Sequence, residues 1–136
     1  MNNSINIHGP LIDEILAHVR NLHPQEACGL LVGRGTDAAR FLPTTNILAS
    51  ETAYEIDPAE LASIFRSLRE SGDSLVAIVH SHPRGPAEPS ERDLNRAYYP
   101  EVAHLIVSLA TLESPQLRTF RIIDGQPWEI ELHVIL

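Results

Sequence analysis

The chain has few basic residues for its size. Ten basic residues, all of them arginines, stand against eighteen aspartates and glutamates in 136 residues, which gives a formal net charge of -8. Proteins that bind nucleic acid or anionic membranes usually carry a basic surface that attracts the phosphates. The sequence therefore predicts no nucleic-acid partner and no membrane partner.

Cysteine and long hydrophobic runs are also scarce. The single cysteine, Cys28, cannot form an internal disulfide. The N-terminal stretch lacks the basic start of a secretion signal, and Asp13 and Glu14 interrupt its apolar residues. No run approaches the ~18 consecutive apolar residues that a membrane-spanning helix needs. These absences favour a cytoplasmic protein.

What is present is typical of a globular protein. Apolar residues make up 43% of the chain and charged residues 21%, and a chain of this length is large enough to bury its own core. No repeat, low-complexity segment or linker interrupts it, so we expect one domain over residues 1–136.

Hydrophobic spacing predicts two long helices and several strands. The helices are expected at 10–22 and 57–71, the second capped by Asp57 with Pro58 in its first turn. The strands are expected at 29–33, 39–47, 74–79, 101–109, 116–123 and 127–135. The element order predicts an α/β fold with a mixed β-sheet flanked by helices in three layers.

The stretch "AIVHSHPRGPAEPSERDL" (77–94) holds the most informative pattern. It begins as a buried strand and ends in two histidines, His80 and His82, whose side chains point to the same face because they are two residues apart. After a loop rich in proline, Ser90 stands where a helix N-cap is expected, with Asp93 three residues later. Two imidazoles and a carboxylate leave one position of a tetrahedral zinc open, as in catalytic sites.

Each half of this pattern has an ordinary explanation. Histidines at a strand end are more often surface or hydrogen-bonded groups than metal ligands, and Ser90 with Asp93 alone is a variant of the capping box. Their combination at this spacing favours His80, His82 and Asp93 as a metal-binding set.

The segment "HSHPRGPAEPSERD" resembles the signature of the JAMM (MPN-plus) metalloproteases, and "HPQEACGLLVG" (23–33) resembles the segment of their prokaryotic members that carries a catalytic glutamate. The resemblance implies a cytidine-deaminase-like fold and a Zn²⁺ ion bound by His80, His82 and Asp93. It also implies that Glu26 is the general acid/base and that Ser90 helps to hold the oxyanion.

The same resemblance implies a substrate class. JAMM enzymes cut after the C-terminal glycines of ubiquitin or ubiquitin-like proteins, so the expected partner is a ubiquitin-like or sulfur-carrier β-grasp protein with a Gly-Gly tail. The bond, whether isopeptide, linear peptide or cysteine adduct, stays open, as does the oligomeric state. We expect the tail to bind in extended form against a sheet edge near residues 44–55.

Several alternatives stay open. The chain could be a non-catalytic MPN-type binding module, or resemble RadC-type proteins, which share the pattern of "HPRGPAEPSERD". Iron or manganese could replace zinc at such a ligand set. A thiol protease using Cys28 is disfavoured because no motif supplies its base, and the zinc deaminase motif is missing. Packing roles are expected for Tyr98, Tyr99 and Trp128, and no role for His104.

Overall fold

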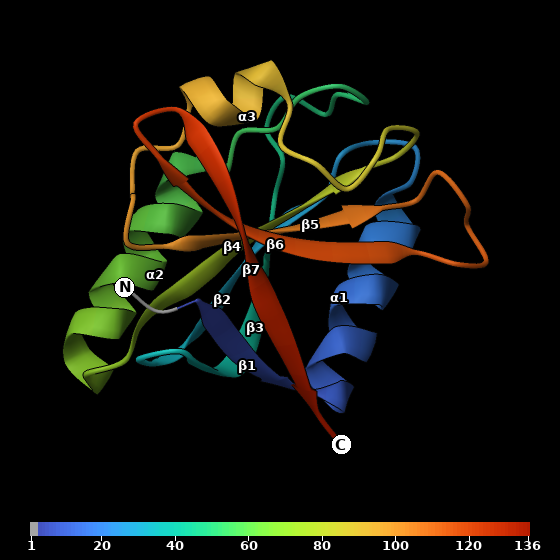
Figure 1. The fold of residues 1–136 in the computed structure, drawn as a ribbon. Helices are drawn as coiled ribbons and strands as arrows, with labels where there is room; N and C mark the ends of the chain where they lie inside the picture. The colour runs from blue at the N-terminus through green and yellow to red at the C-terminus, as the bar shows by residue number, and fades with distance from the viewer. Residues whose placement is uncertain (1–2) are drawn as a thin grey trace.

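The computed structural model describes residues 3–136 and contains seven strands and three helices (Figure 1). In chain order they are β1 (Ser4–His8), α1 (Gly9–Leu22), β2 (Cys28–Arg34), β3 (Asp37–Thr44), α2 (Pro58–Ser71), β4 (Ser74–His82), α3 (Glu91–Asn95), β5 (Ala103–Ser108), β6 (Gln116–Ile123) and β7 (Gln126–Ile135).

The strands form one mixed sheet in the order β1-β3-β2-β4-β5-β6-β7. Neighbouring strands are antiparallel except that β4 pairs with β5, and β1 with β3 and β7, in parallel. The pairing of β1 with both end strands closes the sheet into a barrel, although its link to β3 is the single pair Asn6 and Asp37. The expected mixed sheet with helices is confirmed. Its closure is a feature that the three-layer prediction did not contain.

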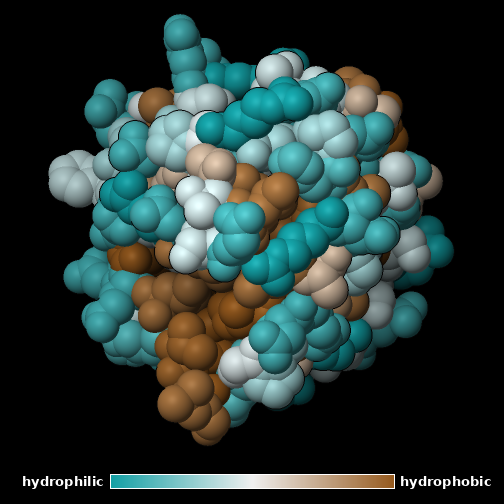
Figure 2. Space-filling view, turned by 90° about the vertical axis from the view of Figure 1, so that its right-hand side faces the viewer, coloured by the Kyte–Doolittle hydropathy of each residue, from teal (hydrophilic) through white to brown (hydrophobic). Residues whose placement is uncertain are grey.

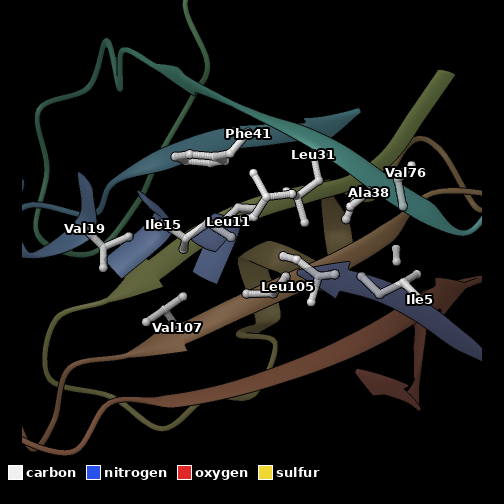
Figure 3. Packing of buried hydrophobic residues seen from close by; sticks show 14 of the residues in the cluster. Ile5, Leu11, Ile15, Val19, Leu31, Ala38, Phe41, Val76, Leu105 and Val107 are labelled. Carbon is white, nitrogen blue, oxygen red and sulfur yellow. The ribbon is translucent and has the colours of Figure 1, made fainter. Parts of the chain in front are cut away.

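Helices cover both faces of the central strands. The larger core lies on the α1 side, where Ile15 and Val19 pack with Leu31, Leu105 and other fully buried residues (Figure 3). A smaller core lies on the α2 side around Leu30 and residues of α2. Strands β4 and β5 are almost continuously apolar because both of their faces are covered.

The predicted boundaries agree with local chemistry. The Asp57 side chain caps α2 by accepting the Ala59 N–H, and the helix ends at Gly72, whose φ of 79° lies in the left-handed region that suits glycine. Asp124 and Gly125 both have positive φ in the tight turn between β6 and β7.

Strand β1 was missed. It has five residues, only two of them buried, and it is held mainly by pairing with β7 at the far end of the chain. Such long-range pairing leaves no local pattern in the sequence.

The prediction that Tyr98, Tyr99 and Trp128 are packing residues is wrong for Tyr98 and Trp128, whose side chains are mainly exposed, and holds for Tyr99. Tyr98 is 71% exposed and Trp128 62% exposed, while Tyr99 is 38% exposed and contacts the ring of Phe65. Trp128 belongs to the first half of β7, where residues 126–129 are all exposed. Aromatic composition did not predict which of these rings the sheet covers.

Hydrophobic side chains also reach the surface on the α1 side of the molecule, where Figure 2 shows an apolar area among hydrophilic neighbours. The chain ends in three exposed apolar residues, Val134, Ile135 and Leu136. The C-terminus lies at the end of the molecule opposite α3 (Figure 1).

Within residues 3–136, no helix has the length and apolar character needed to cross a membrane.

Candidate metal centre

The two histidines of the motif meet at the end of β4. Their Nε2 atoms lie 3.1 Å apart, as expected for alternate residues of an extended strand. His80 is fully buried and His82 is 8% exposed. The strand therefore delivers both imidazoles into one protected space.

Asp93 completes this cluster from α3. Its Oδ2 atom lies 3.1 Å from the Nε2 atom of each histidine. The first turn of α3 fixes the carboxylate through a capping box: Ser90 N–H donates to Asp93 Oδ2, and Asp93 N–H donates to Ser90 Oγ. The ordinary capping role and the convergence with the histidines thus coexist.

The three atoms fit a zinc ion in type and spacing. Tetrahedral zinc with bonds of about 2.0–2.1 Å separates its ligand atoms by about 3.3–3.5 Å, close to the 3.1 Å spacings of this cluster. The Nδ1 atom of His82 donates to the Pro86 carbonyl at 2.8 Å, which directs the Nε2 atom inward. Such an outer contact is typical of histidine ligands.

His80 is held differently. Its ring stacks on Tyr54 with 4.5 Å between the ring centroids, and its buried Nδ1 has no hydrogen-bond partner within residues 3–136. Burial lowers the pKa of His80, although Asp93 opposes the shift, so this imidazole is neutral as a metal ligand must be.

The carboxylate and the second histidine stabilise each other's charge. Burial by itself would raise the pKa of Asp93, but hydrogen bonds from His80 and His82 outweigh it and hold that pKa well below its usual range. Burial would lower the pKa of His82, but its contacts with Asp93 and the Pro86 carbonyl raise it overall. Asp93 is thus ionised at neutral pH.

Glu26 lies beside the histidines, just before β2. It is 6% exposed, and burial raises its pKa to about 7, with the charge of Asp93 adding to the effect. Ligand atoms of Glu26, His80 and His82 all lie within 4.8 Å of one another. The arrangement supplies a carboxyl group near the cluster that is able to take up and release a proton at neutral pH.

Contacts that the sequence did not reveal hold Glu26 in place. Asn46 donates to the Glu26 carbonyl at 2.9 Å and to Ala53, while its Oδ1 accepts the N–H groups of Leu48 and Glu55. This one amide ties the loop before α2 to the segment that carries Glu26. Its only signal in the sequence is its place in "TNILASETAYEIDP".

Ser81 provides a second tie, between β4 and the start of β2. Its Oγ accepts the Ala27 N–H at 2.9 Å, and its own N–H donates to the Ala27 carbonyl at 3.0 Å. The middle residue of the HxH pattern therefore positions Glu26 relative to the histidines.

Cys28 is close in sequence but chemically quiet. It is buried, Thr44 donates a hydrogen bond to its sulfur, and burial raises the pKa of its thiol to about 11. A thiol protease needs a readily formed thiolate, so this site does not suit thiol chemistry.

A cavity of about 230 Å³ adjoins the cluster on the α2 side. Tyr54 and Asp93 form the wall shared with the histidine cluster, and the apolar lining comes from residues such as Leu61 and Phe65. His104, for which no role was expected, lies in the same wall; it is 4% exposed and burial lowers its pKa to about 4.

Two inward-facing imidazoles, a fixed carboxylate and a buried glutamate are the groups that a metal-dependent hydrolase uses. Comparison with known proteins agrees: residues 8–123 match the family of prokaryotic homologs of the JAB domain. The chain belongs to this family, and the resemblance to JAMM proteins is confirmed.

Individual relatives cover nearly the whole chain. It is 35% identical to a CysO-cysteine peptidase of Mycobacterium tuberculosis, over 95% of this chain and 90% of the relative. It is 37% identical to a probable TtuB-protein conjugate cleaving protease of Thermus thermophilus, over 92% and 79%. A solution structure of a Desulfitobacterium hafniense protein superposes with a TM-score of 0.87 at 35% identity, covering 96% and 92%. The chain is accordingly a JAMM-type peptidase.

Proposed function

We propose that the protein is a zinc-dependent peptidase that cuts the bond after the C-terminal glycines of a ubiquitin-like or sulfur-carrier protein. The observation that carries this proposal is the convergence of His80, His82 and Asp93 at 3.1 Å beside the buried Glu26. His80, His82 and Asp93 are the proposed ligands. A zinc ion held there would polarise the scissile carbonyl and make a water nucleophilic near neutral pH.

Glu26 is the proposed general acid/base. Its raised pKa, about 7, lets it accept a proton from the attacking water and return it to the leaving amine. Ser90 is the proposed oxyanion donor. Its Oγ accepts the Asp93 N–H, so the hydroxyl proton stays available for a developing negative charge.

The substrate class follows from relatives named for CysO-cysteine and for TtuB conjugates. We propose that the glycine tail lies extended beside residues 44–55, close to the Glu26 backbone. Ile47 and Leu48 support this position because they are large hydrophobic residues exposed to 45% and 41% in that loop. The last two residues of such a tail are glycines without side chains, so the backbone of the tail would approach the cluster closely.

Two finer expectations stay predictions alongside this function. They are the cytidine-deaminase-like arrangement of layers around the site and a cytoplasmic location.

The experiment is cleavage of carrier proteins extended past their terminal glycines, with and without added zinc. We expect zinc-dependent release of the extension, and loss of cleavage when the two glycines are deleted. Matched controls are the same carrier with the glycines replaced by alanines and the variant Asp93→Asn. Binding of the carrier without cleavage under all metal conditions would instead indicate a binding module.

A further inference from the structure

The cavity beside the metal centre has charged as well as apolar side chains in its wall. Apolar side chains and tyrosines form most of its wall, while Arg92 and Arg96 contribute two guanidinium groups. Glu55 and Asp93 line the same cavity, so its acidic and basic side chains balance in number. What sets the two arginines apart is whether a carboxylate pairs with them.

Neither guanidinium is paired with a carboxylate in the part of the chain that the structure describes. Other arginines are paired there, such as Arg34 with Asp73 and Arg84 with Glu51. No hydrogen bond or ion pair of the Arg92 or Arg96 side chain occurs among these residues. Arg92 is nonetheless half-buried. A partly exposed guanidinium without a paired carboxylate keeps its N–H donors available for an anionic ligand.

The other charged groups of the cavity do not fill this role. Asp93 is occupied by the two histidines and by the Ser90 N–H. Glu55 is exposed at the rim and forms no ion pair within the described chain. His104 leaves its buried Nε2 without a hydrogen-bond partner in that part of the chain, which adds a second unsatisfied polar group to the same wall.

Position relates this charge to the reaction. Arg92 precedes Asp93 on α3, and the Arg92 charge acts on the Glu26 carboxyl, the group proposed to protonate the leaving amine. In a free amino acid attached through its amine, the α-carboxylate is separated from that amine by one carbon atom. A carboxylate so close to that amine would fall in this cavity, whose wall holds both Asp93 and Arg92.

We propose that Arg92 is a specificity-determining residue that binds the free α-carboxylate of a single amino acid released from the carrier tail. This rests on the function proposed above. The amide C–N bond after the last glycine breaks, water supplies the hydroxyl of the new glycine carboxylate, and the amine leaves with a proton from Glu26. Arg96 reinforces the positive field from the next turn.

The size of the cavity suits a single amino acid. Its volume of about 230 Å³ is below the ~300–1,000 Å³ of pockets for drug-sized ligands. A polypeptide joined through a lysine side chain has no free carboxylate near the scissile bond. The charge and the size together point to an amino-acid adduct.

The test compares two substrates on the zinc-loaded enzyme. One is a carrier extended by a single cysteine with a free carboxylate, and the other is the same carrier extended by cysteine amide. We expect kcat/KM to be at least about 10-fold higher for the acid, the effect of a charge-assisted hydrogen bond. Arg92→Gln should abolish the preference, and Arg92→Lys should retain part of it.

The matched control is Arg69→Gln, which removes the same charge from an exposed position of α2 outside the cavity. It should keep the preference for the acid. Binding offers a readout besides turnover: in a Glu26→Gln background, calorimetry should show tighter binding of the acid than of the amide. The additional change Arg92→Gln should remove that difference.

Three outcomes would overturn the proposal. Equal cleavage of acid and amide by the wild type would exclude carboxylate recognition. An equal loss for both substrates in Arg92→Gln would mean that Arg92 acts through Glu26. The third outcome concerns acidic side chains in the carrier tail, each replaced by the corresponding amide. If such a replacement removed the effect of Arg92, then Arg92 would bind the carrier tail and not the released amino acid. Cleavage of no substrate by the zinc-loaded wild type would instead count against the proposed function.

Discussion

Two neighbouring strands bury histidines in opposite surroundings. On β4, His80 and His82 face the carboxylate of Asp93 at the strand end. On β5, His104 pairs in register with Ile78, two residues before His80, and its Nε2 has no partner within residues 3–136. His82 has a raised pKa, whereas burial lowers that of His104 to about 4.

The comparison shows that burial alone does not make a reactive site. Desolvation acts on all three histidines, but the hydrogen bond to Asp93 outweighs it only at His82, where the Pro86 carbonyl adds to the effect. The position of Asp93 depends on a helix of five residues, whose capping box orients its carboxylate. Chemistry is concentrated where a strand ends and a helix begins.

The largest effect is expected for Glu26→Gln. Glutamine keeps the size and the burial of Glu26 but cannot carry the proton, so kcat should fall by about 10²–10⁴-fold. Steady-state cleavage of a carrier fusion measures this loss, with elemental analysis as the control that zinc binding persists. If the zinc-loaded Glu26→Gln variant kept the wild-type kcat, Glu26 would not be the general acid/base.

A smaller effect is expected for Ser90→Ala. Loss of the proposed oxyanion donor should lower kcat by about 10²–10³-fold, and loss of the N-cap should lower the free energy of unfolding by about 1 kcal/mol. Ser90→Asn is a suitable control because asparagine also caps helices. If it restored both stability and kcat without a hydroxyl, capping alone would explain Ser90.

The smallest effect concerns the pH dependence of stability, and it tests the contrast between His104 and the histidines of β4. Its pKa of about 4 in the folded protein lies below the ordinary value of 6.5, so the unfolded chain binds more protons between these pH values. The resulting stability is fully present above pH 6.5 and is lost as the pH falls toward 4, by up to roughly 3 kcal/mol.

Replacing His104 tests this. In His104→Leu the free energy of unfolding, measured by denaturant titration, should fall less between pH 6.5 and 4 than in the wild type. His104→Gln is the control, because it keeps a buried polar group that does not titrate and should show the same reduced pH dependence. An unchanged pH dependence in both variants would contradict burial as the cause.

Local patterns predicted much of this structure. The periodicity of hydrophobic residues and the capping residues indicated both long helices and six of the seven strands. The spacing of His80, His82 and Asp93 indicated a cluster that the fold does bring together. These features depend on residues within a few positions of one another.

The remainder depends on contacts between distant segments. Strand β1 is held by β7 across more than a hundred residues, and Asn46 supports Glu26 from a loop twenty residues away. The cavity beside Asp93 is assembled from α2, α3 and three strands. No spacing rule reports such assemblies, so neither the cavity nor the burial of His104 was predicted.

The central claim is that His80, His82 and Asp93 hold a catalytic zinc ion. The most direct measurement is the metal content of the purified wild type and Asp93→Asn by elemental analysis, with cleavage of a carrier fusion followed on the same samples. The account predicts about one zinc per chain in the wild type, and loss of both zinc and cleavage in the variant. A wild type that cleaves without bound metal, or a variant that retains zinc and full cleavage, would contradict it.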